Sequence, residues 1–343
     1  MTSKYPERLS GKIVLVTGAT GLIGTTIIKR LLAFNEQSED SPIQIIAAVR
    51  NEEKARRCFE KNENLRFWVN DICTLKPESR NINFIIHAAS QTASKSFVTA
   101  PIETIKTAIV GTRNVLELAR QNPVEGVVYL SSMEVYGSPT TDKKIMEDCG
   151  TSLDSMTVRS CYPESKRMCE CLCSSYAAEY GIPAKAVRLT QTFGPGVDYS
   201  DGRVFAEFAR NAIEGKDIIL HTKGETKRSY LYTEDAVEAI LTVLLKGCSS
   251  EAYNAANEAT YCSIYEMACL VAEKCSAKRL NVIIRDENDS TMRGYAPTLH
   301  MNLDTSKLQG LGWKPTIGLE QMYNNMIESM KHVTCKNDGV QIS

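Results

Sequence analysis

A glycine-rich turn near the start of the chain constrains its fold more than any other segment. Residues 17–24 read TGATGLIG; they follow the β-branched run KIVLVT at residues 12–17, and a segment of helical length, residues 22–34, begins within them. Three glycines at this spacing allow a tight turn, close approach of backbone to a pyrophosphate, and close helix–strand packing. The amino end of the helix adds unpaired N–H groups and partial positive charge. The segment therefore predicts a dinucleotide site formed by Gly18, Thr20, Gly21, Leu22, Ile23 and Gly24.

The first half of the chain alternates predicted strands with predicted helices. Further strands are expected at residues 44–49, 65–69, 84–87 and 127–130, with helices at 52–60 and 102–120. Apolar strands in this alternation predict a parallel sheet covered by helices on both faces. The second half is predicted to contain a strand at 184–189 and helices at 162–180, 204–214, 235–246 and 264–274.

We therefore expect an α/β fold in two domains. A Rossmann-type, doubly wound parallel sheet is expected on residues 1–190, where the strand–helix alternation is clearest. A smaller mixed α/β substrate-binding domain, partly interleaved with the first, is expected on residues 191–335. Residues 336–343 are polar and are expected to form a frayed tail.

Charge and cysteine content limit the classes of partner. The chain has 40 Lys and Arg against 41 Asp and Glu, whereas nucleic-acid-binding domains are usually basic. It shows no apolar run long enough to span a bilayer and no export signal near Met1, so we expect a cytoplasmic protein with no nucleic-acid or membrane partner. The 12 cysteines are then expected as reduced thiols. Cys169, Cys171 and Cys173 are interpreted as small apolar side chains rather than metal ligands, and no metal site is expected.

The end of the second predicted strand bears on the choice between NAD and NADP. An acidic residue there would bond the 2′-hydroxyl of NAD, but this sequence has Arg50, followed by Asn51 and Lys54. A guanidinium matches the 2′-phosphate of NADP in charge and geometry. The alternative is that Arg50 belongs to the solvated start of a basic helix, so both cofactors stay open with NADP slightly favoured. Asp71, after the third predicted strand, is expected to bond the adenine edge.

A YxxxK pair and a serine supply candidate catalytic groups. Tyr162 and Lys166 are four residues apart, which places them on one face of a helix. A tyrosine with its ordinary pKa of ~10 is a poor base at neutral pH, and a nearby lysine cation favours the phenolate. Ser132 follows the apolar strand at 127–130, and parallel sheets bind ligands at the carboxyl ends of their strands.

Taken together, these motifs resemble the extended short-chain dehydrogenase/reductase family, specifically its nucleotide-sugar epimerase/dehydratase branch. The resemblance covers residues 11–330 and includes HAAS at 87–90, SSMEVYG at 131–137, AVRLTQTFGPG at 186–196 and KRSYLYTEDAV at 227–237. It implies that Ser132 and Tyr162 contact a sugar hydroxyl, and that Tyr162 removes its proton while hydride passes to the nicotinamide. It implies that Lys166 bonds the nicotinamide ribose and lowers the pKa of Tyr162. Further contacts are implied for Ile72, Ala88 and Ala89 with the cofactor and for Ser90 with the substrate.

The resemblance also extends to the substrate and to the assembly. Two segments, beginning at Asp201 and Gly224, resemble those that hold the nucleotide diphosphate in UDP-glucuronate decarboxylases and their relatives. Arginine suits a pyrophosphate, so Arg228 is the first candidate, Arg203 the second and Arg293 a third; a surface ion pair is the alternative for each. Family members pair through the helices matching residues 102–120 and 162–180, which implies a homodimer.

The two positions after Ser132 depart from the family pattern. Dehydratases of the family resemble one another in carrying two acids there, whereas this chain has Met133 and Glu134. Met133 exchanges no proton, which argues against a simple 4,6-dehydratase. Glu134 argues for chemistry beyond C4 epimerisation, such as decarboxylation of a glucuronate, although decarboxylases usually have Ser in place of Met133. The alternative is that Glu134 only shapes the pocket.

We therefore predict an NAD(P)-dependent nucleotide-sugar enzyme that oxidises the sugar at C4 and then epimerises, decarboxylates or eliminates. An NADPH-dependent 4-ketoreductase of a nucleotide-linked sugar is the first alternative, because Arg50 favours NADP. A non-catalytic NADP-binding regulator is the second, since a fold alone does not imply activity. The intact set of Ser132, Tyr162 and Lys166 argues against the regulator.

Overall fold

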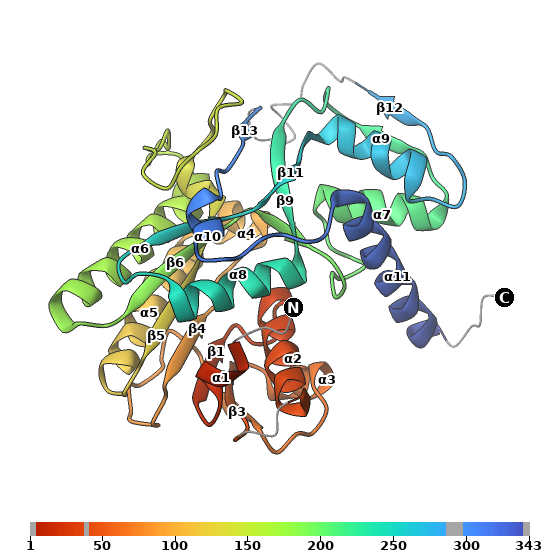
Figure 1. The fold of residues 1–343 in the computed structure, drawn as a ribbon. Coiled ribbons are helices and arrows are strands. Elements are labelled where there is room, and N and C mark those ends of the chain that lie inside the picture. The colour runs from red at the N-terminus through yellow and green to blue at the C-terminus, as the bar shows by residue number, and fades with distance from the viewer. Residues whose placement is uncertain (1–4, 38–40, 286–297, 339–343) are drawn as a thin grey trace.

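A parallel sheet of seven strands forms the centre of the molecule (Figure 1). The computed structural model describes residues 5–37, 41–285 and 298–338. The strand order is β10-β6-β5-β4-β1-β2-β3, and every neighbouring pair is parallel. The strands are β1 (Ile13–Thr17), β2 (Gln44–Val49), β3 (Leu65–Val69), β4 (Phe84–His87), β5 (Gly126–Ser132), β6 (Ala184–Leu189) and β10 (Ala252–Ala255). Since the order runs outward in both directions from β1 and β4, the predicted doubly wound Rossmann-type sheet is confirmed.

Helices cover both faces of this sheet. Val14 and Val16 of β1 share one apolar core with α2 (Leu22–Gln37) and α8 (Thr233–Lys246). Leu15, between them, belongs to a second core with α5 (Pro101–Arg120) and α6 (Cys161–Tyr180). Successive side chains of a strand point to opposite faces, so a strand buried on both faces must be apolar throughout. The shorter helices are α1 (Tyr5–Leu9), α3 (Glu52–Cys58) and α4 (Ser94–Thr99), and α4 lies near the middle of the molecule.

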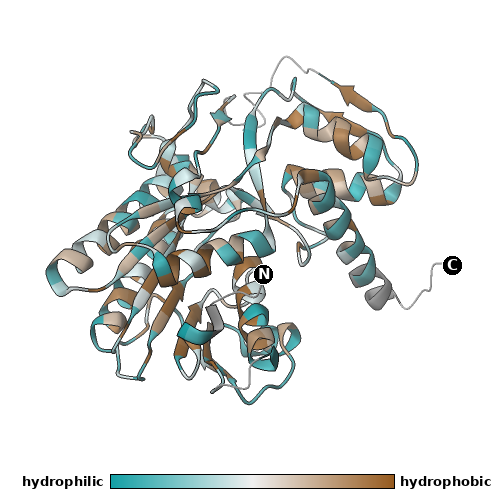
Figure 2. Cartoon of the chain, viewed as in Figure 1, coloured by the Kyte–Doolittle hydropathy of each residue, from teal (hydrophilic) through white to brown (hydrophobic). Residues whose placement is uncertain are grey.

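The second half of the chain builds a smaller part with its own core. Figure 1 shows α7 (Val204–Glu214), α9 (Ile264–Lys274) and α11 (Leu319–Asp338) grouped away from the large sheet, and Figure 2 shows their mixed apolar and polar faces. Phe193 stacks on Phe205 with ring centres 4.6 Å apart, and Tyr230 and Tyr323 pack around them. The remaining elements are β7 (Gln191–Phe193), β8 (Ile218–Leu220), β9 (Lys227–Tyr232), β11 (Asn257–Ser263), β12 (Val282–Ile284), β13 (His300–Met301) and α10 (Ser306–Gly310).

The two parts are interleaved along the chain. α8 and β10 return to the large sheet between segments that build the smaller part. α11 was not predicted as an element, and it continues to Asp338, inside the segment assigned to the tail. No helix within the described ranges is both long enough and apolar enough to cross a bilayer.

A largely buried ion pair joins α6 to β6. Arg188 on β6 contacts both carboxylate oxygens of Glu170 on α6, with Nε–Oε1 and Nη2–Oε2 distances of 3.0 and 2.7 Å. Its Nη1 also donates to the Tyr136 hydroxyl, at 2.8 Å, in the short 3-10 helix η1 (Met133–Tyr136). A buried charge is stable only when paired and hydrogen-bonded, as here. The network fixes η1 relative to α6, so the two segments that carry the predicted catalytic residues hold one geometry.

Candidate active site

A cleft of about 710 Å³ lies at the carboxyl ends of the central strands. The site residues predicted from the sequence line this cleft, with Arg293 as the one exception because it falls outside the described residues. Those on the dinucleotide side are Gly18, Thr20, Gly21, Leu22, Ile23, Gly24, Arg50, Asp71, Ile72, Ala88 and Ala89. Those towards the smaller part are Ser90, Ser132, Glu134, Tyr162, Lys166, Arg203 and Arg228. The fold therefore brings together segments that are far apart in sequence.

The glycine turn between β1 and α2 leaves no room for side chains. Gly18 has a φ of +65°, and a Cβ there would lie 2.7 Å from the backbone of Ala88. A Cβ on Gly24 would lie 2.3 Å from the carbonyl oxygen of Gly18. The first residues of α2 line the cleft, so the amino end of that helix faces it. This cradle of bare backbone at a helix amino end fits a dinucleotide pyrophosphate.

The end of the cleft beside β2 carries an exposed cation. Arg50 lines the cleft directly after β2, and no carboxylate among the described residues forms an ion pair with it. Asn51 caps α3 by accepting the backbone N–H of Lys54 at 2.9 Å. In contrast, Arg56 and Arg57 on the same helix pair with glutamates one turn earlier. Arg50 is therefore the guanidinium of this segment that stays available to a ligand.

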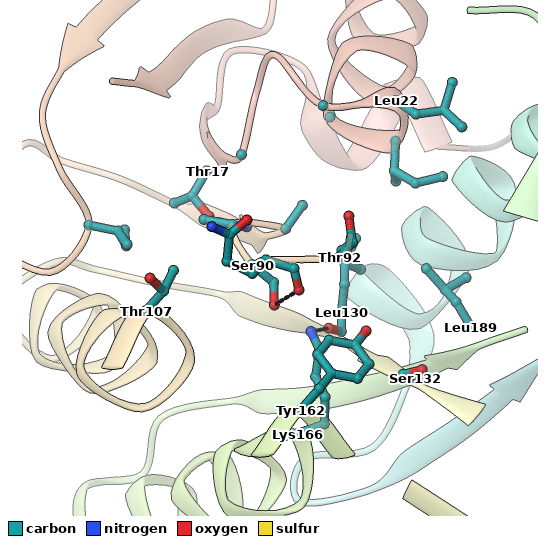
Figure 3. A pocket seen from close by; sticks show the side chains of 18 of the residues that line it. Thr17, Leu22, Ser90, Thr92, Thr107, Leu130, Ser132, Tyr162, Lys166 and Leu189 are labelled. Carbon is teal, nitrogen blue, oxygen red and sulfur yellow. Dashed lines mark hydrogen bonds between the residues drawn. The ribbon is translucent and has the colours of Figure 1, made fainter. Parts of the chain in front are cut away.

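Three predicted catalytic side chains lie on one side of the cleft. Ser132 ends β5, Tyr162 lies in the first turn of α6 and Lys166 in the second. Figure 3 shows them grouped together, with Thr17 and Leu22 on the opposite side. Lys166 Nζ donates to the Leu130 carbonyl at 2.7 Å and lies 5.6 Å from the centre of the Tyr162 ring.

The surroundings of Tyr162 oppose its ionisation. Burial raises the pKa of Tyr162 well above its ordinary value, and the negative charge of Glu134 raises it further. A hydrogen bond with Ser132 and the positive charges of Arg159 and Arg203 act in the opposite direction. The phenol is thus the stable form in this protein, and several groups converge to make the phenolate accessible.

Lys166 is a buried amine, and its surroundings shift its own pKa. Burial lowers the pKa of Lys166 to about 8, because its ammonium lies in a desolvated position. The groups that lower the pKa of Tyr162 are Ser132, through a hydrogen bond, and the positively charged Arg159 and Arg203. The amine is held by the Leu130 carbonyl at the floor of the cleft.

Two residues that sequence reasoning missed complete the surroundings of Tyr162. Arg159, in the 3-10 helix η2 (Val158–Ser160), pairs with Glu134 through Nη1–Oε2 and Nη2–Oε1 distances of 2.8 and 3.3 Å. Phe97 on α4 stacks on the Tyr162 ring, with centres 4.2 Å apart and planes 11° from parallel. Arg159 had a detectable signal, because it precedes Tyr162 by three residues at the start of a helix. Phe97 had none, since only the fold brings α4 to α6.

Two arginines lie at the end of the cleft nearest the smaller part, and they differ in their ion pairing. Arg203 pairs with Asp201 two residues earlier, with Nε 3.0 Å from Oδ1. Arg228 has no ion pair with a described carboxylate; its Nη1 contacts Gln191 Oε1 at 3.4 Å, and its buried Nε lacks a partner among the described residues. A buried guanidinium nitrogen without a partner is costly, so this side chain is suited to an anion in the cleft.

Met133 lines the cleft but is almost fully buried in an apolar cluster. It packs with Val135 and Ile145, and its Sδ accepts a hydrogen bond from Thr190 Oγ1 at 3.3 Å. The position therefore contributes apolar packing, whereas Glu134 is the acid that remains at the cleft.

Comparison with known proteins agrees with this geometry. Residues 14–256 match the model of the NAD dependent epimerase/dehydratase family. The UDP-glucuronic acid decarboxylase 1 of Xenopus tropicalis is 27% identical over 331 residues, which cover 95% of this chain and 75% of that protein. The dTDP-D-glucose 4,6-dehydratase of Bos taurus is 30% identical over 346 residues, covering 94% of this chain and 90% of the relative.

Solved structures share the fold. The UDP-glucose 4-epimerase of Thermotoga maritima, solved with UDP-glucose, gives a TM-score of 0.78 at 22% identity, covering 94% of this chain and 99% of that one. The UDP-glucose 4-epimerase of Thermus thermophilus, solved with NAD, gives 0.75 at 23% identity, covering 93% and 99%. These likenesses extend over both parts of the molecule.

Proposed function

Because the chain belongs to the NAD-dependent epimerase/dehydratase family, we propose that it oxidises a nucleotide-linked sugar at C4 and then epimerises, decarboxylates or eliminates. One observation carries the proposal: Tyr162 and Ser132 line the same cleft as the glycine turn and Arg228, whose guanidinium forms no ion pair with a described carboxylate. A dinucleotide and a nucleotide diphosphate sugar each have a site at one end, with the proton-accepting phenol between them.

Each half of the cleft has a distinct task in this proposal. The turn at Gly18–Gly24 holds the pyrophosphate of NAD or NADP, Asp71 and Ile72 contact the adenosine, and Ala88 and Ala89 line the path to the nicotinamide. Lys166 holds the nicotinamide ribose. The bound dinucleotide supplies the hydride acceptor. Ser90, Ser132, Arg203 and Arg228 hold the substrate, with Arg293 as a further candidate. We assign the first task to a domain of residues 1–190 and the second largely to residues 191–335.

Tyr162 acts as the base of the first step. Its phenolate takes the proton of the C4 hydroxyl, while Ser132 donates a hydrogen bond to the same oxygen and orients it. The C4 ketone that results makes the neighbouring carbon reactive, and Glu134 is an acid of the cleft, close enough to Tyr162 to act on its pKa, that can exchange a proton there. The relatives are named for a uronic acid decarboxylation and a sugar dehydration.

A substrate panel tests this function directly. Purified protein is incubated with UDP- and dTDP-linked hexoses and hexuronates, and products are separated by mass spectrometry while absorbance at 340 nm reports the reduced dinucleotide. Turnover of at least one nucleotide sugar, without net consumption of cofactor, is expected. Binding of nucleotide sugars without any chemical change would contradict the proposal.

A 4-ketoreductase is the second candidate, and Arg50 is the observation that favours it. We propose that Arg50 binds the 2′-phosphate of NADP, because it is the cation at the end of β2 that forms no ion pair with a described carboxylate. Arg50→Ser is then expected to weaken NADPH binding by about fivefold, since an exposed, salt-screened contact is worth about 1 kcal/mol. NADH binding stays unchanged, as measured by fluorescence titration.

Arg56→Ser is the matched control for that prediction. Arg56 lies on the same helix but pairs with Glu52, so its loss leaves the NADPH affinity unchanged. Co-purification of the wild-type protein with tightly held NAD would contradict the assignment of Arg50 and favour the reactions in which the hydride is returned within one turnover.

We further propose a homodimer that forms through α5 and α6. Apolar side chains remain exposed on these helices and beside them: Ile102 is 71% exposed, Val98 62% and Met168 48%. Ile102→Glu is expected to give a monomer in light scattering at micromolar concentration, because it places a charge in an apolar contact. Val69→Glu on β3, where Val69 is 49% exposed, leaves the dimer intact. A monomeric wild-type protein would contradict this proposal.

A further inference from the structure

Arg159 and Glu134 form a two-point ion pair at the wall of the cleft. Nη1 and Nη2 of Arg159 reach different oxygens of Glu134, at 2.8 and 3.3 Å. The two side chains come from η2 and η1, 25 residues apart in sequence, and both line the cleft. They are 39% and 28% exposed, so the pair is open to the cleft on one side. A bidentate contact with a guanidinium fixes the orientation of a carboxylate as well as its position.

The same guanidinium takes part in a stack that ends at Tyr162. The Arg159 guanidinium carbon lies 5.3 Å from the centre of the Phe97 ring, and Phe97 in turn stacks on Tyr162. Phe97 is fully buried, and its carbonyl accepts a hydrogen bond from the Cys161 thiol at 3.3 Å. The Arg159 guanidinium is therefore held by the Phe97 ring and by the Glu134 carboxylate.

The pair also balances charge at the Tyr162 hydroxyl. The charged groups around that hydroxyl come from four elements: Lys166 on α6, Glu134 on η1, Arg159 on η2, and Arg203 at the start of α7. Glu134 raises the pKa of Tyr162, whereas Arg159 and Arg203 lower it. Removal of Arg159 alone would leave the negative charge of Glu134 facing Tyr162 with less compensation.

We propose that Arg159 is a positioning residue of the active site, which holds the Glu134 carboxylate beside Tyr162 so that Glu134 exchanges the proton on the carbon next to C4. This inference rests on the proposed oxidation at C4. In that first step the C4 hydroxyl proton passes to Tyr162 and the C4 hydrogen leaves as hydride to the dinucleotide. The hydrogen on the neighbouring carbon is then acidic, because it lies beside a ketone.

The second step needs only Glu134 and Tyr162 as proton donors and acceptors. Glu134 takes the proton from the neighbouring carbon, and the electron pair of that C–H bond forms the double bond of an enolate with its charge on O4. The Tyr162 phenol, carrying the proton from the first step, donates a hydrogen bond to O4. Return of a proton from Glu134 restores the ketone. If Glu134 exchanges its proton with solvent, deuterium from heavy water enters the sugar at that carbon.

Arg159→Gln and Arg159→Lys test the proposal in single-turnover experiments in heavy water. Absorbance at 340 nm reports the first hydride transfer, and mass spectrometry reports deuterium in the sugar. Arg159→Gln is expected to slow deuterium entry by at least about tenfold, the loss of one well-placed charged contact. Arg159→Lys keeps the charge without the two-point contact and is expected to recover part of the rate.

The pH dependence of the first hydride transfer distinguishes a positioning role of Arg159 from a purely structural one. Loss of a purely structural residue would not shift this pH dependence. The rate rises with pH as the Tyr162 phenol ionises. Arg159→Gln removes a charge that lowers the pKa of Tyr162, so the rise moves to higher pH. Glu134→Gln removes a charge that raises that pKa, so the rise moves to lower pH.

Arg30→Gln is the matched control. Arg30 contacts Glu238 through Nε and Nη2 at 2.9 and 2.7 Å, the two side chains are 39% and 27% exposed, and the guanidinium lies 4.7 Å from the Phe34 ring centre. Arg30 lies outside the cleft, so its loss costs similar stability with no shift in pH dependence. Hydride transfer in the wild-type protein, with unaltered deuterium entry and pH dependence in Arg159→Gln, would overturn this inference alone. Absence of hydride transfer in the wild-type protein would overturn the proposed function and this inference with it.

Discussion

Replacement of Tyr162 by phenylalanine is expected to reduce turnover of the nucleotide sugar by about 10²–10⁴-fold, the usual contribution of a positioned general base. Phenylalanine keeps the ring that stacks on Phe97, and Tyr162 is only 8% exposed, so the change removes one hydroxyl and leaves no large cavity. Dinucleotide affinity, measured by fluorescence titration, stays nearly unchanged. The expected effect is therefore on kcat and not on cofactor binding.

The pH dependence of the wild-type enzyme follows from the same residue. Burial and Glu134 raise the pKa of Tyr162, so the phenol predominates at neutral pH and the fraction of phenolate increases as the pH rises. The rate of hydride transfer is expected to increase with pH through neutrality and to lose this dependence in Tyr162→Phe. Tyr323→Phe is the control, because the buried Tyr323 hydroxyl is remote from the cleft and lacks a partner among the described residues. Unaltered turnover in Tyr162→Phe would rule out the mechanism.

Replacement of Gly24 by alanine is expected to lower dinucleotide affinity by about 5- to 150-fold. The new Cβ would lie 2.3 Å from the Gly18 carbonyl oxygen, closer than any real contact, so the backbone of the turn must move. Overpacking of this kind costs about 1–3 kcal/mol, and the displaced atoms are those that face the pyrophosphate. Calorimetric titration of the dinucleotide measures the loss, and thermal unfolding measures the accompanying destabilisation.

Gly150→Ala is the control for the glycine turn. No atom lies within 4 Å of a Cβ at Gly150, and its φ is not in the left-handed region, so both affinity and stability are expected to stay at wild-type values. Wild-type dinucleotide affinity in Gly24→Ala would show that the turn does not approach the cofactor closely.

The sequence predicted six of the seven strands of the central sheet because their signals are local, whereas the edge strand β10 was not predicted. β2, β3, β4 and β6 begin and end where the apolar runs predicted, and α7 and α9 match their predicted ranges as well. Strand and helix periods, cap residues and glycine turns act over a few residues, so they can be recognised without the fold. The short strands β8, β12 and β13 escaped recognition because runs of two or three residues have no period.

The candidate site likewise combines features set by neighbouring residues in the chain with features set by the packing of distant ones. The sequence by itself determined the glycine turn, the Tyr162 and Lys166 pair on one helix face, and the serine at the end of β5, since each depends on neighbours in the chain. Tertiary structure alone decided which charges surround Tyr162. Ion pairs and ring stacks form between side chains brought together by packing, and no local period records that Phe97 covers Tyr162 or that Arg159 holds Glu134. The pKa of Tyr162 depends on those distances and on burial, which is why the fold, and not the motif, determines it.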